Sequence, residues 1–523
     1  MDSLRQRLEA VLPKSHCFGV YHVSTPPTKC AALYSAPPNE RSDRTFCETH
    51  FLAVSIDKYN DAKVENGDSS LSSSREVLVL AIEVLLFTTA HSTTLFVSKA
   101  DSTGYLTLLN LPKGTPSPIR EACSTFISYL IDTRRRKDLP FVVSLFARSQ
   151  GQYLFPGSVE TAGKHVLDDR GLIKWWCKVL DPMLEIKSWE TTQGYIVVPG
   201  LETNETRGFV PRSSLAKWSL THPLERISHY TREFDWVPPR CLIPRYPDDP
   251  KSRFRDELDE EAARSGGMKL TGSWKSVKTL DMFWEMMAFR QECSSGRMTG
   301  FIWLVFDDQP PKELVPPSTP TKQQTTAPAL QTTPRKVNPS KNDASLAKDA
   351  HKEKESKKKK DKERKRKRYP PGATVKIRNP RIKTEQKNYL LKQPESTPYY
   401  YWPAAGRGEK IVSEKIYKRL NELLLHLDFA NIDKAVSSTK RWIREGSLGN
   451  SWGQQITGQR EIPAASEASA APTVNNLSGL VKRKRETNGE GVNVLGANLV
   501  KKAKADDGAN VLSAGLVRKK PKE

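Results

Sequence analysis

The sequence predicts a mixed α/β fold: a central β-sheet packed by helices, forming a single body that a C-terminal helix closes. Over residues 1–310, apolar runs of strand length alternate with amphipathic segments of helical period. An apolar stripe of helical spacing near residue 413, following a long basic stretch, predicts the closing helix. The remaining parts of the chain are expected to be a disordered basic insertion and a disordered basic tail.

Five apolar runs have the length and composition of buried strands, and each is bounded by turn-forming or charged residues. They are residues 77–87, 93–101, 139–148, 194–200 and 300–308. The most apolar of them, at 77–87, is too short to cross a bilayer and contains Glu83. The sequence therefore predicts no membrane-spanning segment.

Helical periodicity marks the segments between these runs. The first 16 residues form an amphipathic helix that lacks the apolar core of a signal peptide. Ser117 and Pro118 are typical of a helix cap and first position, which predicts a helix over 117–131. Two more helices are expected, one beginning at Asp169 and one running over 276–296.

Charge divides the chain into two parts. Residues 1–310 hold 38 Lys and Arg against 38 Asp and Glu, whereas residues 311–523 hold 45 against 22, which accounts for the whole net charge of +23. We expect 1–310 to be the folded body and 311–398 a Pro/Thr-rich and Lys/Arg-rich insertion. Residues 399–445 would complete the body, and 446–523 would be the tail. This asymmetry is typical of a nuclear protein or a polyanion binder.

The tail carries a repeated pattern of a short apolar segment followed by a basic cluster. Residues 493–504 and 510–522 are similar to each other, and 477–485 is a looser copy. Such segments suit nuclear-import receptors or the acidic surface of a histone chaperone. The alternative is a solvated low-complexity tail.

The cysteines indicate no disulfide framework and no metal site. Seven of them are scattered along the chain, an odd number, so reduced thiols and an intracellular protein are expected. Cys47 and His50 have the spacing of half a zinc site, but no second pair stands at a suitable distance in the sequence. A small buried thiol near a surface histidine is the simpler interpretation.

Three stretches of the body place polar residues at the ends of predicted strands and helices. Residues 96–104 end a strand in Lys-Ala-Asp-Ser, and 112–121 lead a Gly/Pro loop into a helix start. A helix N-terminus can bind a diphosphate through its free N–H groups, although simple capping explains the same pattern. Residues 145–158 contribute Arg148 on a polar loop.

Two adjacent tryptophans lie on the helix predicted from Asp169. Side chains of neighbouring residues point about 100° apart on a helix, so one ring can face the core while the other lines a cleft. Helical periodicity places Trp176 on the inner face, and core packing alone would explain it equally well. His165 precedes this helix.

The stretch "PDDPKSRF" at 247–254 concentrates charge around a proline. A turn explains the motif in part, because Asp and Pro are turn residues. A lysine substrate must lose a proton before it attacks a thioester, and a carboxylate whose pKa is raised by apolar surroundings can accept that proton. Asp249 is the candidate base, Asp248 a group that binds a cationic lysine, and Lys251 a cation that compensates their charge.

Four segments together resemble the fungal histone H3 acetyltransferases, which are related in fold to the CREB-binding-protein acetyltransferases. They are "FVSKADSTGY" (96–105), "LFARSQGQYLFPGS" (145–158), "KHVLDDRGLIKWW" (164–176) and "IPRYPDDPKSRF" (243–254). The resemblance covers about 1–310 and resumes near 411–445. It departs from the family in the short connection at 132–140 and in the long basic insertion.

The resemblance implies acetyl-coenzyme A as cofactor and assigns roles to individual residues. Trp176 matches an active-site tryptophan, Asp249 the acid/base group, and Lys251 a lysine that the enzyme acetylates on itself. Asp101 and Asp248 complete the expected catalytic set. The expected cofactor contacts are Ala100, Asp101, Ser102, Thr115, Pro116, Ser117, Pro118, Ile119, Phe146, Arg148, Gln150, His165, Val166, Leu167 and Trp175.

It further implies a nuclear enzyme that acetylates lysines of histone H3, presented as H3–H4 by histone chaperones. The lysines are one near the first helix of H3 and others in its tail, and the role is in replication-coupled chromatin assembly and DNA-damage tolerance. The basic insertion would add weak DNA contacts through phosphates. The rival hypothesis is a chromatin-binding adaptor without enzymatic activity, which explains the basic half of the chain but not the neutral, Trp-rich body.

Overall fold

The computed structural model describes residues 2–57, 75–265, 273–290, 293, 296–308, 389–447 and 451–463, and all of these belong to one compact unit. Most of the predicted insertion and of the predicted tail lies outside the described residues. None of the helices described is long and apolar enough to cross a membrane.

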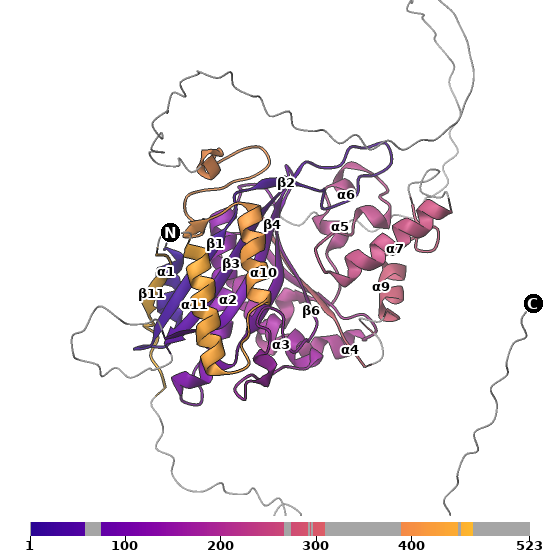
Figure 1. Ribbon diagram of the computed structural model, residues 1–523. Helices are drawn as coiled ribbons and strands as arrows, with labels where there is room; N and C mark the ends of the chain where they lie inside the picture. Colours follow the sequence, from indigo (N-terminus) through magenta and orange to yellow (C-terminus); the bar gives the residue numbers. More distant parts are fainter. Residues whose placement is uncertain are drawn as a thin grey trace, which may run out of the picture. The chain divides into compact units, whose positions relative to one another are not determined.

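In the described residues, eleven strands form one mixed sheet (Figure 1). Its order is β10-β1-β3-β4-β5-β6-β9-β7-β8, with β11 paired to β1 and β2 paired to β3. The strands are β1 (Cys17–Ser24), β2 (Thr28–Cys30), β3 (Thr45–Asp57), β4 (Glu76–Thr88), β5 (Thr93–Ser102), β6 (Phe141–Ala147), β7 (Thr191–Val197), β8 (Trp218–Ser219), β9 (Gly300–Asp307), β10 (Lys410–Ile411) and β11 (Gln454–Thr457).

The mixed α/β fold with helices on a central sheet is confirmed, and the five predicted strands correspond to β4, β5, β6, β7 and β9. β4 is buried along nearly its whole length, which explains why its sequence is a continuous apolar run rather than an alternation. β1 and β3 were not predicted. They carry polar residues at buried positions, among them His22, Glu48 and His50, which conceal the strand pattern.

Helices cover both faces of the sheet. The first core includes α1 (Leu4–Val11), α2 (Pro118–Arg134) and α3 (Asp169–Leu180), which confirms three predicted helices. The second core contains α7 (Pro250–Arg264) and α9 (Leu280–Ala288). α9 is shorter than the predicted 276–296 because Thr279 caps its start. The short helices are α4 (Thr203–Thr206), α5 (Leu224–Ile227) and α6 (Tyr230–Glu233).

The C-terminal part packs on the N-terminal body, as the apolar stripe near 413 predicts. Tyr417, Leu420 and Leu424 of α10 (Glu414–Leu425) are buried in the first core. A further helix, α11 (Ile432–Ser447), lies beside α10 (Figure 1), and its Thr439 hydroxyl accepts a hydrogen bond from the Leu78 N–H of β4. β11 then pairs with β1, so the ordered part extends beyond the boundary expected at 445.

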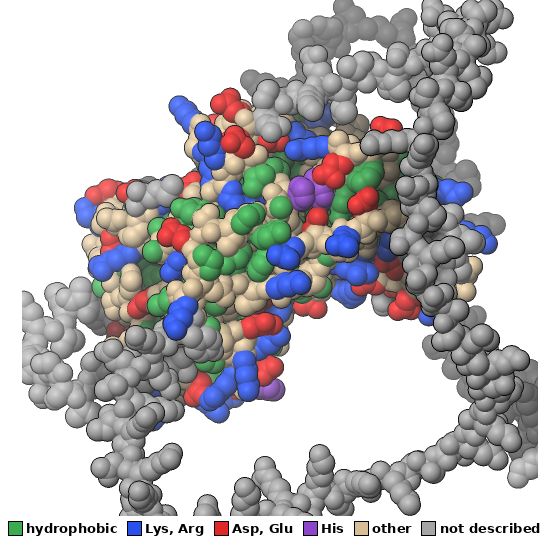
Figure 2. All heavy atoms as spheres, turned by 90° about the horizontal axis from the view of Figure 1, so that it is seen from above, with side chains coloured by type: hydrophobic (Ala, Val, Ile, Leu, Met, Phe, Trp, Pro, Cys, Tyr) green, Lys and Arg blue, Asp and Glu red, His purple; other side chains and the backbone are tan. Residues whose placement is uncertain are grey.

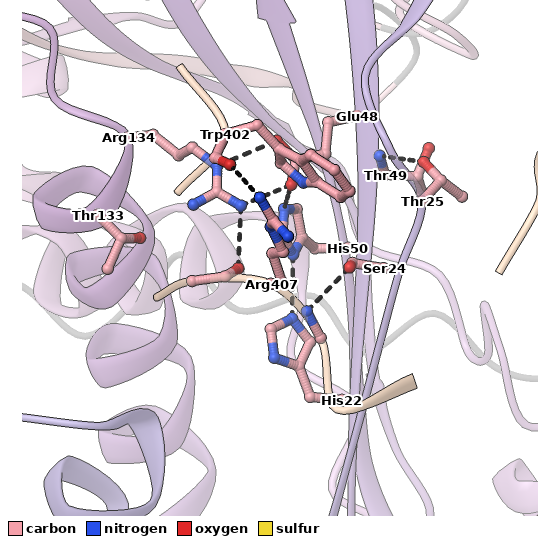
Figure 3. A network of polar contacts seen from close by, with 12 residues as sticks. His22, Ser24, Thr25, Glu48, Thr49, His50, Thr133, Arg134, Trp402 and Arg407 are labelled. Carbon is pink, nitrogen blue, oxygen red and sulfur yellow. Dashed lines mark hydrogen bonds and ion pairs between the residues drawn. The ribbon is translucent and has the colours of Figure 1, made fainter. Parts of the chain in front are cut away.

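A buried ion pair fixes the segment that enters this C-terminal part (Figure 3). The Nε and Nη2 groups of Arg134 donate to the Glu48 carboxylate at 3.0 and 2.6 Å, while Nη1 donates to the Ala405 carbonyl and Nη2 also donates to the Gly406 carbonyl. Burial by itself would raise the pKa of Glu48, but Arg134 and His50 lower it to about 2. Arg134 therefore bonds to the backbone of two residues that lie 271 and 272 positions further along the sequence.

His50 belongs to the same network. One ring nitrogen lies 2.8 Å from Glu48, and the other lies 3.0 Å from a ring nitrogen of His22 (Figure 3). Burial lowers the pKa of both imidazoles, which favours their neutral forms. The interpretation of Cys47 and His50 as a buried thiol near a surface histidine is wrong, because His50 is fully buried in this network and Cys47 is only partly buried.

The surface of the body mixes both signs of charge. Figure 2 shows Lys and Arg side chains interspersed with Asp and Glu side chains on one face, with hydrophobic side chains between them. This agrees with the equal numbers of acidic and basic residues in 1–310.

Candidate active site

A pocket lies where two parallel strands separate. β5 and β6 pair only from Thr93 to Phe96 and from Phe141 to Ser144. Beyond these residues β5 follows β4 and β6 follows β9. The register of β5 against β4 shifts between Val97 and Lys99, and such a bulge bends a strand. The pocket therefore opens between the C-terminal ends of β5 and β6.

The cavity has a volume of about 200 Å³. Twelve of the residues expected at the site line it: Ala100, Asp101, Ser102, Ile119, Phe146, Arg148, Gln150, His165, Val166, Leu167, Trp175 and Trp176. Sequence reasoning missed the other lining residues, which are Leu80, Val97, Ser98, Lys99, Leu145, Ser149, Tyr153, Lys164 and Leu172. Several of these residues lie within the motifs quoted above. Their position in a motif could have identified them, whereas their residue type could not.

Thr115, Pro116, Ser117 and Pro118 lie just before and at the start of α2, but they do not line this pocket. Ser117 occupies the cap position without a side-chain capping bond. Ile119 reaches the pocket from the first turn of α2. The helix start is therefore next to the cavity, and the four preceding residues lie outside its wall.

Asp101 is a buried anchor of the pocket wall. One carboxylate oxygen accepts the backbone N–H groups of Tyr153, Leu154 and Phe155 at 2.7–3.2 Å. The other accepts the N–H of Ser102 and the Lys164 ammonium, each at 2.8 Å. Because these donors occupy both oxygens, Asp101 holds the 153–155 segment and is a positioning residue rather than a group that reacts.

Asp169 anchors another part of the pocket wall, at Ser149, in a similar way. Its carboxylate accepts the Ser149 N–H at 2.7 Å, the Met298 N–H at 3.1 Å and the Arg297 guanidinium at 2.9 Å. It thus joins the loop after β6, the start of α3 and the approach to β9. The sequence indicated Asp169 only as the start of a helix.

Trp175 and Trp176 both line the pocket, with ring centroids 4.9 Å apart at 81°. Trp176 also belongs to the first hydrophobic core and is 6% exposed. The two interpretations of this side chain, core packing and cleft lining, therefore hold together. The edge-to-face arrangement fixes the orientation of both rings.

The charged side chains in the wall are mostly cationic. The Arg148 Nε is buried and has no hydrogen-bond partner among the described residues. The Lys99 ammonium lies 3.7 Å from Glu83 and 3.9 Å from Asp248. A buried donor without a partner is costly, so the wall is suited to an acceptor-bearing ligand such as a phosphate or carbonyl group.

The "PDDP" motif is a helix start, and its two aspartates have different environments. Asp248 has a left-handed backbone (φ 58°), and its side chain is 75% exposed beside Lys99. Asp249 is fully buried, caps α7 by accepting the Lys251 N–H, and contacts the Lys251 ammonium. Of these two aspartates, Asp248 is the one that presents its carboxylate to solvent beside the pocket-lining Lys99.

Lys251 is buried with Asp249 on the side of the second core. Its ammonium lies 4.8 Å from the ring centroid of Tyr246 and 5.3 Å from that of Phe301. Burial raises the pKa of Asp249 and lowers the pKa of Lys251, while their mutual attraction opposes both shifts. Neither residue lines the pocket, but Phe301 pairs with Phe146, which does.

Comparison with known proteins places this chain in a family. The histone acetyltransferase KAT11-type domain matches residues 4–140 and 136–445. The chain is 39% identical over 529 residues to the histone acetyltransferase rtt109 of Aspergillus flavus, covering 92% of this chain and 88% of that one. It is 32% identical to the histone acetyltransferase rtt109 of Schizosaccharomyces pombe, covering 44% and 57% respectively.

Comparison of the fold with solved structures points to the same family. The crystal structure of Rtt109 from Aspergillus fumigatus superimposes with a TM-score of 0.63 at 36% identity, over 88% of this chain and all of that one. The expected resemblance to the fungal histone H3 acetyltransferases is confirmed by these relatives. The chain belongs to the KAT11-type histone acetyltransferase family.

Proposed function

We propose that this protein transfers the acetyl group of acetyl-coenzyme A to lysines of histone H3, presented as H3–H4 by histone chaperones in the nucleus. The observation that carries the proposal is the pocket, since eleven expected cofactor contacts and the expected active-site Trp176, from four separated stretches of the chain, line one cavity. Membership of the histone acetyltransferase family supports the reaction type.

The pocket has the properties that acetyl-coenzyme A requires. When bound, this cofactor supplies an acyl group activated as a thioester. The unpartnered Arg148 Nε and the Lys99 ammonium suit its phosphates or carbonyl groups. Trp175, Phe146 and Ile119 offer apolar and aromatic surface to the rest. Asp101 and Asp169 keep the walls in place through their bonds to backbone N–H groups.

Asp248 and Asp249 are proposed to act on the substrate lysine. An incoming lysine is a cation, so the exposed Asp248 carboxylate beside the pocket is suited to binding it. Asp249 remains the proposed proton acceptor, and its raised pKa supports this role. Because Lys251 occupies its carboxylate, Asp249 can accept a proton only when that contact is released. Acetylation of Lys251 by the enzyme itself would remove the competing charge.

The test is mass spectrometry of H3–H4 incubated with the full-length protein and acetyl-coenzyme A, with and without a histone chaperone. We expect acetylated H3 peptides, more of them when the chaperone is present, and an acetylated Lys251 peptide from the enzyme. Absence of acetylated H3 under both conditions would reject the proposal.

A non-enzymatic chromatin adaptor is the second candidate, and the basic region at 351–368 is the observation that favours it. An adaptor has no use for a cofactor pocket. Coenzyme A at 100 times its Kd should stabilise an acetyltransferase by about 2.7 kcal/mol and an adaptor not at all.

A further inference from the structure

Away from the pocket, two histidines and an aspartate from three separate segments converge. Asp43 lies in the connection before β3, His91 in the turn between β4 and β5, and His229 directly before α6. One potential ligand atom from each lies within 4.8 Å of the other two. None of the three lines the pocket, and the acetyl-transfer site does not use them.

The spacing of these groups is unusual for a simple ion pair. His91 Nε2 is 4.0 Å from one oxygen of Asp43, and His229 Nε2 is 3.6 Å from the other oxygen. Both distances are too long for a hydrogen bond, whose usual limit is about 3.2 Å. Ligand atoms about 2.0–2.1 Å from a tetrahedral zinc ion are about 3.3 Å apart. The distances of 3.6 and 4.0 Å between the imidazole nitrogens and the Asp43 oxygens are therefore only slightly longer than the spacing of zinc ligands.

The two imidazoles lie face to face, with ring centroids 3.9 Å apart and an interplanar angle of 2°. A single ion cannot lie in both of two parallel ring planes, so one ring must turn for both to ligate. His91 is the side chain with room to turn, since it is 40% exposed whereas Asp43 and His229 are each 15% exposed. His229 is held by its contact with the Tyr230 ring at 4.0 Å.

We propose that Asp43, His91 and His229 form a binding site for a divalent transition metal of the zinc class. Two imidazole nitrogens and one carboxylate oxygen are a donor set that Zn²⁺ accepts, with water completing the sphere. Because His91 is partly exposed, the ion can enter from solvent. The site lies outside the pocket, so its role is structural rather than catalytic.

Such an ion would cross-link parts of the chain that bear on the active site. The turn that carries His91 is already fixed by Arg136, which donates to the carbonyls of Thr89 and Ser92. His229 lies in the segment that leads to Asp248 and Asp249. A metal ion bound by both His91 and His229 would fasten the segment that follows His229 to the turn between β4 and β5. It would stabilise the fold without entering the acetyl-transfer site.

The test is a Zn²⁺ titration of the chelator-stripped full-length protein in competition with a chromophoric chelator. We expect one Zn²⁺ per chain, and at least about a tenfold loss of affinity in His229→Gln, His91→Gln and Asp43→Asn. His426→Gln, a change at an exposed histidine of another segment, should bind as the wild type does. A Zn²⁺-dependent rise in melting temperature should appear in the wild type and the control, and disappear in the three variants.

His91→Gln keeps the test decisive, because the side chain is in an exposed turn and its loss should leave the metal-free fold intact. Affinity equal to that of the wild type in all three variants would overturn the proposal, since the ion would then be bound elsewhere, for example by cysteines. Failure of the wild type to bind Zn²⁺ would overturn it as well.

Discussion

At the scale of single residues, the main result is that carboxylates near the pocket perform different tasks. Asp101 and Asp169 bond to backbone N–H groups, Asp249 caps a helix and contacts Lys251, and Asp248 is exposed beside Lys99. Sequence reasoning proposed Asp249 as a base, Asp248 as a lysine-binding group and Asp101 as a further catalytic residue, but it could not show which of these carboxylates is buried. Burial decides the role, and burial depends on the tertiary fold.

Asp101→Ala should destabilise the protein and abolish cofactor binding together. The change leaves three backbone N–H groups without their acceptor and the buried Lys164 ammonium without its carboxylate, which should cost at least about 3 kcal/mol. Asp168→Ala, which removes only the cap of α3, should cost about 1 kcal/mol. Urea unfolding of both variants measures these losses in the free energy of unfolding. Full stability with lost transfer would mean that Asp101 reacts and does not merely position.

Asp249→Asn should lower the acetylation rate by about 10²–10⁴ while cofactor affinity changes little. As a base, Asp249 is active only when ionised, so wild-type activity should rise with pH through its raised pKa. The variant should lose that rise. The measurement is kcat/KM against pH for wild type and variant. An unchanged pH profile with a reduced rate would assign Asp249 to positioning through Lys251 and α7.

At the scale of elements, the sequence predicted those whose apolar pattern is uninterrupted. β4 and the stripes of α2, α3 and α10 bury apolar residues at regular spacing, and all were found. β1 and β3 were missed because His22, Glu48 and His50 are polar and yet buried. Their partner Arg134 lies far away in the sequence, and no local pattern shows such a network.

Arg134→Met should destabilise the body by about 3–5 kcal/mol, because Glu48 would remain buried without its cation. The carbonyls of Ala405 and Gly406 would also lose their donors. Arg419→Met is the matched control. Its ion pair with Glu445 is exposed, and its loss should cost less than about 1 kcal/mol. Chemical denaturation compares the two, and equal losses would contradict the account of this network.

At the scale of the whole molecule, the folded body extends further than composition suggested. The sequence placed the start of the tail at 446, but Trp452 and Ile456 are buried, and β11 pairs with β1. A short strand between a helix and a basic segment has too few residues to stand out as a pattern. The end of the folded body is therefore evident only from the tertiary structure, in which β11 pairs with β1.

Two truncations separate the body from the tail. A chain ending at 463 should keep its melting temperature and its activity on free histone, and lose activity on chaperone-bound histone or nuclear accumulation. A chain ending at 447 also loses Trp452, which lies 5.1 Å from the Tyr21 ring and 5.6 Å from the Trp442 ring, and should melt several degrees lower. Equal melting temperatures would show that β11 contributes nothing to the body.

The central claim, that the opening between β5 and β6 holds acetyl-coenzyme A, is tested most directly by calorimetric binding of coenzyme A to wild type, Arg148→Met and Arg212→Met. Arg148 has a buried, unpartnered donor in the pocket, whereas Arg212 is exposed outside it. Loss of a hydrogen bond from a charged donor costs about 1.5–3 kcal/mol, or roughly 10- to 150-fold in Kd. The account predicts such a loss for Arg148→Met alone; equal affinity in all three proteins, or no binding to the wild type, would contradict it.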